Sequence, residues 1–92
     1  MPKRTGRRWR EHTVPRILRR DHGVCHLCDR PGADTADHLV PHAHGGPDTL
    51  DNLRAAHQTC NRIRGDRSIS WARDEIARRL VADQPADDAW TW

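Results

Sequence analysis

The sequence predicts a small α+β domain, in which two short extended segments and three helices surround a metal site. Three observations support this prediction. The chain has 92 residues, of which 35% are hydrophobic and 4% aromatic, so its apolar core is small and needs a further stabilising element. Three cysteines and a histidine are spaced as metal ligands. Apolar residues recur at helical spacing near both ends, and shorter extended segments lie between them.

A first helix is expected over residues 13–21, with Thr13 as a candidate N-cap. Its apolar residues recur at helical spacing. They are Val14, Ile17 and Leu18. Residues 1–12 precede this helix and are expected to form a flexible basic arm.

The centre of the chain is expected to form a β-ribbon followed by a helix. Two short extended segments are expected at residues 35–41 and 50–56, and the Gly-Gly-Pro sequence at residues 45–47 forces a loop between them. A short helix is expected from His57 onward, with Gly65 at its end. These elements make a ribbon with one helix behind it.

A last helix is expected over about residues 70–82, because apolar residues again recur at helical spacing, and Ser70 is its candidate cap. We interpret it as an amphipathic helix that covers the core. Residues 83–92 form an Asp-rich tail to which the sequence assigns no role. The expected organisation is therefore an arm, one domain over residues 13–82 with a motif core at residues 22–66, and a tail.

Two matched pairs of residues predict a structural zinc site. Cys25 and Cys28 are followed, after twenty-eight other residues, by His57 and Cys60, with two residues inside each pair. Three thiolates and one imidazole make a tetrahedral set with no open position, which is typical of structural zinc. One alternative is that the cysteines are simply buried as small apolar groups. Another histidine could also replace His57 as the fourth ligand, and the candidates are His26, His42 and His44.

Basic residues gather at the start of the chain. Residues 1–20 contain eight Lys or Arg residues and one acid, whereas residues 21–61 contain six Asp and two Arg. Such an arm suits contact with a phosphate backbone, which gives affinity without sequence preference, and the alternative is a solvated tail. No segment has the apolar length of a membrane span, and the arm lacks the apolar stretch of a signal peptide. We therefore expect a cytoplasmic protein with reduced thiols.

A second set of polar residues lies between and just after the predicted zinc ligands. Its parts are Asp37-His38, Gly45-Gly46, Asp51-Asn52 and Cys60-Asn61. Thirteen residues separate His38 from Asn52, and eight separate Asn52 from Asn61. With this spacing, residues 20–66 resemble the HNH endonuclease family. The resemblance implies the ββα-metal fold, in which two short strands and a helix surround one divalent cation.

The resemblance and the chemistry of phosphodiester hydrolysis together give four residues an expected role. His38 is the expected general base, since a neutral imidazole accepts a proton from water. Asp37 and Asn61 offer hard oxygen ligands, and the family assigns to them a catalytic Mg²⁺ or Mn²⁺. Asn52 matches the middle Asn of the family, a catalytic-site residue that braces the loop and helps to orient the base. Each residue also has a plain alternative as a turn, strand or capping residue.

The pattern also raises one difficulty and two departures. Neighbouring strand residues point to opposite faces, so Asp37 and His38 reach one phosphate together only if a bulge or strand end intervenes. His57 stands where many members of the family carry Cys. His42 and His44 add two histidines to a loop, where they are expected to be solvated, although either could touch a substrate phosphate or a second ion.

Arginines on both sides of this motif are candidate phosphate ligands. Three follow Asn61 along the chain, and three lie in the basic arm. They are Arg62, Arg64, Arg67, Arg7, Arg8 and Arg10. We favour Arg64 among them, and the alternative is a solvated helix face. Trp9 in the arm is expected to pack on the domain rather than to stack on a nucleobase.

These patterns lead us to expect a zinc-stabilised DNA endonuclease of the HNH type, which uses Mg²⁺ or Mn²⁺ and nicks or cuts double-stranded DNA. The alternative is a non-catalytic zinc-knuckle module that binds DNA or RNA. A third hypothesis is an accessory protein with a terminase-like packaging partner, because small members of the family occur beside packaging genes in phage genomes. A chain of 92 residues with one site is expected to be a monomer or weak dimer that nicks DNA.

Overall fold

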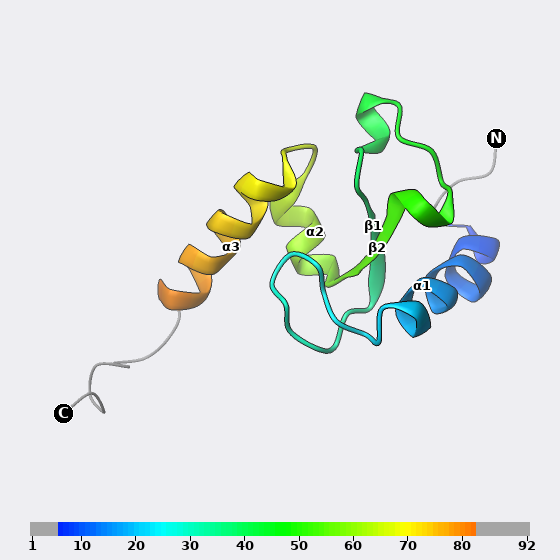
Figure 1. The fold of residues 1–92 in the computed structure, drawn as a ribbon, viewed down its shortest axis with the longest axis horizontal. Helices are drawn as coiled ribbons and strands as arrows, with labels where there is room; N and C mark the ends of the chain where they lie inside the picture. Colours follow the sequence, from blue (N-terminus) through cyan, green and yellow to red (C-terminus); the bar gives the residue numbers. More distant parts are fainter. Residues whose placement is uncertain (1–5, 83–92) are drawn as a thin grey trace.

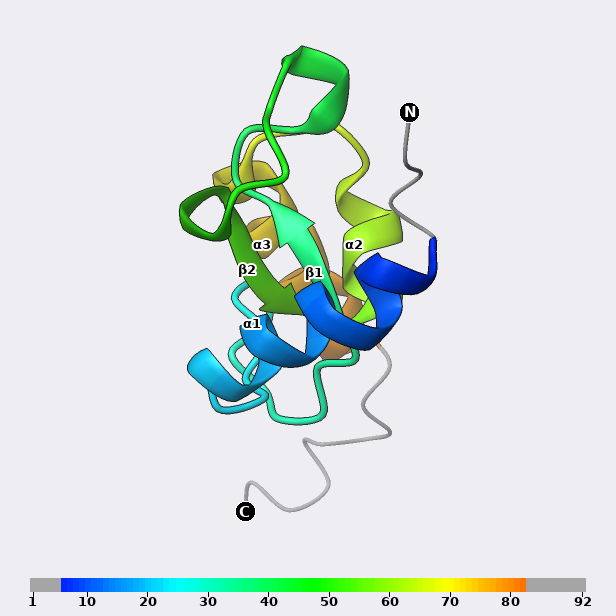
Figure 2. The same cartoon turned by 90° about the vertical axis from the view of Figure 1, so that its right-hand side faces the viewer.

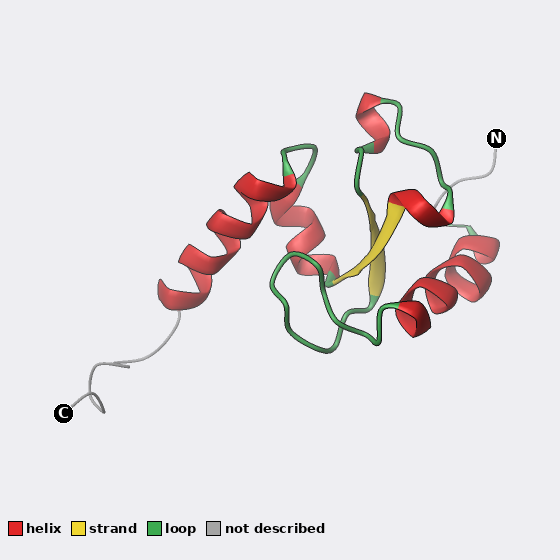
Figure 3. Cartoon of the chain, viewed as in Figure 1, coloured by secondary structure: helices red, strands yellow, loops and turns green. Residues whose placement is uncertain are grey.

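The computed structural model describes residues 6–82, and it combines helices with a small two-stranded sheet (Figures 1 and 3). The predicted α+β class is confirmed. The strands are β1 (Thr35–His38) and β2 (Leu53–Ala56), and the helices are α1 (Val14–Arg20), α2 (Gln58–Arg64) and α3 (Ile69–Ala82). Three shorter helical turns are η1 (Trp9–Thr13), η2 (His42–His44) and η3 (Leu50–Asn52). The predicted tail at residues 83–92 lies outside the described residues.

The two strands form an antiparallel ribbon whose faces are covered by different helices. The register runs from Thr35 opposite Ala56 to His38 opposite Leu53. Helix α1 lies on one side of the ribbon, and α2 and α3 lie on the other (Figures 1 and 2). The ribbon is therefore the middle layer of the domain, and the loop that joins its strands projects from one end.

Each side of the ribbon has its own small apolar core, and alanines supply much of the strand surface. On the α1 side, Ala36 and Ala55 pack among larger side chains from the helix and from β2: Val14, Ile17 and Leu53. The other cluster joins the cysteine-bearing segment to α3, and its buried members are Cys25, Leu27, Ala56, Cys60, Ala72 and Ile76. Because the strand side chains in these clusters are mostly alanines, they add little apolar area to either core.

The structure places the predicted ribbon and helices at slightly shorter or shifted bounds. Strand β1 ends at His38 and β2 begins at Leu53, so the ribbon is shorter than expected. Helix α2 ends before Gly65, as predicted. The prediction that Ser70 caps the last helix is wrong, because the Ser68 hydroxyl accepts the N–H of Trp71 at 3.0 Å. None of the described helices combines the length and hydrophobicity needed to cross a membrane.

The segment before α1 is more ordered than the sequence indicates. Residues 7–12 are helical and lead through η1 directly into α1, so the prediction of a flexible arm is wrong for these residues. Thr13 has helical backbone angles and makes no side-chain cap, which corrects its predicted N-cap role. Trp9 packs against the apolar cluster beneath α1, as expected. This packing gives residues 7–12 a fixed place on the domain, and residues 1–5 of the predicted arm lie outside the described residues.

Candidate functional site

The four predicted zinc ligands come together in one cluster. Their ligand atoms all lie within 4.8 Å of one another. The Nδ1 atom of His57 lies 3.3 Å from the Sγ atom of Cys28 and 3.8 Å from that of Cys60. Cys25 and Cys28 lie in the turn between α1 and β1, His57 directly precedes α2, and Cys60 belongs to α2. Three sulfur atoms and one nitrogen atom at this spacing fit a structural zinc ion.

Backbone groups around the cluster orient its ligands. The Nε2 atom of His57 lies 2.9 Å from the carbonyl oxygen of Pro31, which only accepts hydrogen bonds, so Nε2 carries the hydrogen and Nδ1 is free to bind a metal. His26 instead contacts the carboxylate of Asp37 through Nε2, and it is not a member of the cluster. Among the described residues, His57 is the histidine that lies with the three cysteines.

The surroundings of the cysteines shift the pKa values of their thiols in different directions. Burial raises the pKa of the Cys60 thiol to about 12, and negative charge on Cys25 and Cys28 acts in the same direction. Burial would also raise the pKa of Cys25, but backbone N–H groups of His57 and Leu27 outweigh it and lower that pKa. Three neighbouring thiolates repel one another, and a bound cation offsets this repulsion.

Three of the predicted site residues meet at a second place, away from the cysteines. Asp37, His38 and Asn61 line a cavity of about 240 Å³ at the end of β1. The rest of its lining comes from the loop after β1 and the end of α2: Pro41, His42, Ala43, Gly65 and Asp66. His38 is the last residue of β1, so strand alternation ends there and both neighbouring residues reach the same cavity. The strand end that the sequence required is therefore present.

The carboxylate of Asp37 is buried and held from two sides. Only 4% of the residue is exposed. Its Oδ2 atom lies 2.7 Å from Nη1 of Arg64 and 2.8 Å from Nε2 of His26. Within residues 6–82, the Oδ1 atom makes no hydrogen bond and remains for another partner. With the amide of Asn61 on the same cavity, these oxygens fit a hard divalent cation that keeps several water ligands.

Arg64 is a structural residue, which corrects its predicted role as the preferred phosphate ligand. It is 2% exposed, and its guanidinium ties α2 to the end of β1. Its Nη1 atom donates to the carbonyl oxygen of His38 as well as to Asp37, and Nη2 donates to that of Leu39 at 2.8 Å. Its Nε atom donates to the carbonyl oxygen of Arg67 at 2.7 Å. A guanidinium that is buried and bonded to these four groups is not available to bind a phosphate.

The other candidate phosphate ligands remain on the surface. Arg7, Arg8, Arg10 and Arg62 are exposed. Arg67 lies 4.1 Å from the ring centroid of Trp71, over its face, so part of its guanidinium packs on α3. The structure therefore separates the arginines of the sequence pattern into one buried clamp and several surface cations.

The amide of Asn52 braces the loop between the strands. Its Oδ1 atom accepts the N–H of Val40 at 2.9 Å, and its Nδ2 atom donates to the carbonyl oxygens of Pro47 at 2.8 Å and Val40 at 3.2 Å. Gly46 lies inside the same loop, where a Cβ atom would stand 1.7 Å from the carbonyl oxygen of Val40. Asn52 and Gly46 together hold the loop tightly against the end of β1, so Asn52 acts beside the cavity rather than in it.

We expect Gly46→Ala to destabilise the protein by about 3 kcal/mol, because the added methyl group clashes with backbone that cannot move without breaking the Asn52 contacts. Gly45→Ala is the matched comparison. It introduces a side chain at a left-handed residue with open space around it, and should cost only about 1 kcal/mol. Urea unfolding of both variants measures the difference. Equal losses in the two variants would contradict the clash.

Two residues near the cavity were not assigned catalytic roles from sequence. Asp48 places its Oδ1 atom 2.6 Å from Nε2 of His38, and His26 contacts Asp37 as described above. From the sequence, His26 is only an alternative fourth ligand for zinc, and it lies between Cys25 and Cys28. Asp48 belongs to no sequence motif. The only indication of its role in the sequence is that it is an acidic residue in the loop after His38.

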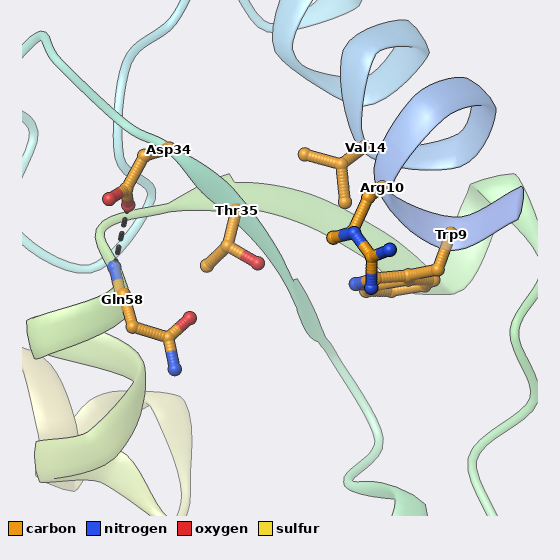
Figure 4. A pocket seen from close by; sticks show the side chains of 6 residues that line it. All are labelled: Trp9, Arg10, Val14, Asp34, Thr35 and Gln58. Atoms are coloured by element: carbon orange, nitrogen blue, oxygen red, sulfur yellow. Dashed lines mark hydrogen bonds between the residues drawn. The ribbon is translucent and has the colours of Figure 1, made fainter. Parts of the chain in front are cut away.

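A larger hollow of about 390 Å³ lies between η1, β1 and α2 (Figure 4). Arg10 and Trp9 lie on one side of it, and Thr35 and Gln58 lie on the other. The carboxylate of Asp34 accepts the backbone N–H of Gln58 at 2.8 Å, which ties the start of α2 to the residue before β1 (Figure 4). The indole of Trp9 also stacks on His38, so this hollow adjoins the residues that line the smaller cavity.

Comparison with known protein families finds one that fits this arrangement. Residues 25–67 match the model of the HNH endonuclease family. This stretch includes the four residues of the Cys3His cluster and all the residues that line the cavity at the end of β1. No curated protein and no solved structure matches the chain significantly.

Proposed function

Residues 25–67 belong to the HNH endonuclease family, and from this premise we propose that the protein is a metal-dependent endonuclease that hydrolyses phosphodiester bonds of DNA. The observation that carries the proposal is the meeting of Asp37, His38 and Asn61 on one cavity, in a domain that also holds a Cys3His cluster. A domain that only bound nucleic acid would have no need of a proton acceptor next to hard oxygen ligands.

In the proposed reaction, His38 accepts a proton from the water that attacks phosphorus, and the 3′ oxygen of the DNA leaves. The products then carry 5′ phosphate and 3′ hydroxyl ends, as the chemistry of the family implies. Asp37 and Asn61 would hold Mg²⁺ or Mn²⁺, which when bound neutralises charge on the phosphate and on the departing oxygen. Arg64 and His26 keep the carboxylate of Asp37 in place throughout.

DNA is the proposed partner, and its backbone would be met by exposed arginines. Arg62 follows Asn61 directly on α2 and is exposed, and Arg7, Arg8 and Arg10 are exposed on the helical segment that carries Trp9. Contacts of this kind bind phosphates without reading sequence, and they weaken as salt is added. We therefore propose binding to double-stranded DNA with little sequence preference by a monomer or weak dimer.

The test is cleavage of supercoiled plasmid by the zinc-loaded protein in Mg²⁺ or Mn²⁺. Conversion to the nicked form, blocked by removal of the divalent cation while zinc is retained, would support the proposal. DNA binding that is indifferent to Mg²⁺ and yields no product would favour the non-catalytic module instead. Cleavage that required an added terminase-like protein would favour the accessory role.

A further inference from the structure

We propose that Asp48 is the positioning residue of His38, and that it fixes which ring nitrogen accepts the proton from water. The proposal rests on the nuclease function proposed above, because it concerns the base of that reaction. The Oδ1 atom of Asp48 lies 2.6 Å from Nε2 of His38. This distance is just below the range of about 2.7–2.9 Å for charge-assisted N–H···O hydrogen bonds. Asp48 is not among the polar residues of the sequence motif.

The chemistry of the two groups decides where the hydrogen lies. An ionised carboxylate only accepts hydrogen bonds, so the hydrogen between the two side chains belongs to Nε2 of His38. In the neutral ring, the other nitrogen, Nδ1, is then unprotonated. Nδ1 is therefore the atom that accepts the proton of the attacking water, while the hydrogen on Nε2 stays where it is. The carboxylate of Asp48 then lies beside the positive charge that forms on the ring.

Other contacts restrict the ring to one orientation. The indole of Trp9 stacks on His38 with 5.9 Å between ring centroids and 6° between the ring planes. The carbonyl oxygen of His38 is held by Arg64. With its face, its backbone and Nε2 all held, the imidazole of His38 has little freedom to rotate, and only 8% of the residue is exposed.

The loop brace described above supplies the position of Asp48. The Nδ2 atom of Asn52 donates to the carbonyl oxygen of Pro47, which is the residue directly before Asp48. The side chain of Asp48 is half exposed, so its own burial does not hold it in place. The order of contacts thus runs from Asn52 through Pro47 to Asp48 and then to His38. Through these contacts, Asn52 affects the position of the base His38.

The first test is spectroscopic and needs no activity. In zinc-loaded protein with ¹⁵N-labelled histidine and no other divalent cation, we expect a downfield Nε2–H proton signal from His38, visible because the carboxylate slows its exchange. The signal should vanish in Asp48→Ala and persist in Asp74→Ala, which removes an exposed acid of α3, away from the cavity. A hydrogen found on Nδ1 in the wild type, or a signal unchanged in Asp48→Ala, would overturn the proposal.

The second test is kinetic. We expect Asp48→Ala to lower kcat for plasmid cleavage roughly 10- to 100-fold with little change in KM, since the contact acts on the base and not on DNA binding. Asp48→Glu should restore part of the loss, and Asp74→Ala should cleave like the wild type. An unchanged kcat in Asp48→Ala would refute the positioning role. If the wild type cleaves nothing, the nuclease proposal fails, whereas the Nε2–H signal still decides the His38–Asp48 contact.

Discussion

His38→Ala is expected to reduce DNA cleavage by roughly 10²- to 10⁴-fold, which is the usual contribution of a general base. The side chain borders the cavity that also receives Asp37 and Asn61, and its imidazole is held there by the contact with Asp48. Removal of the imidazole leaves the oxygen ligands in place but takes away the group that accepts the proton from water.

Plasmid cleavage measures this effect, and stability must be followed alongside it because His38 also stacks on Trp9. Circular dichroism melting and zinc content show whether the variant keeps its fold. His44→Ala is the matched control, since His44 is an exposed histidine of the same loop that does not line the cavity. A folded His38→Ala protein that cleaves at the wild-type rate would rule out His38 as the base.

Loss of zinc is expected to unfold the domain. The two apolar clusters are small, and one of them is built around Cys25 and Cys60 themselves. Structural zinc contributes about 10 kcal/mol or more of apparent binding free energy in small zinc domains, which is comparable to the whole stability of a domain this size. A chain with so little core cannot lose that contribution and stay folded.

The experiment is a chelator titration followed by circular dichroism, with zinc and then Mg²⁺ added back. Zinc should restore the helical signal, and Mg²⁺ should not, because thiolates and imidazole bind soft metals. His57→Ala should be unfolded at neutral pH, whereas His44→Ala, a change of the same residue type outside the cluster, should fold normally. A zinc-free protein with native helical content and a cooperative melt would refute the structural role.

Much of the fold was predictable because its signals are local. The paired spacing of Cys25, Cys28, His57 and Cys60 identifies one metal cluster without knowledge of the chain path, since two residues between ligands suit a tight turn or a helix. Apolar periodicity located α1 and α3, and the glycines between the strands located the ribbon. The polar triplet of the cavity followed from the resemblance of the same short stretch to the HNH endonuclease family.

What the sequence did not predict depends on contacts between distant segments. Arg64 is an arginine on a short helix, and only the packing of α2 against the end of β1 makes it a buried clamp. The order of residues 7–12 depends on Trp9 packing beneath α1. The contact between Asp48 and His38 depends on the path of the loop, which Asn52 and Gly46 determine. No periodicity or spacing rule contains this information.

The burial of Arg64 affects how mutagenesis of this protein must be interpreted. An alanine scan for DNA-contacting residues that scored only cleavage would rank Arg64 highly, because its loss would release Asp37 and the end of β1 at once. That ranking would be a false positive. Scans of small basic enzymes therefore need a denaturation curve for every arginine variant, and Arg62, two positions away and exposed, provides the comparison that separates a DNA contact from a structural support.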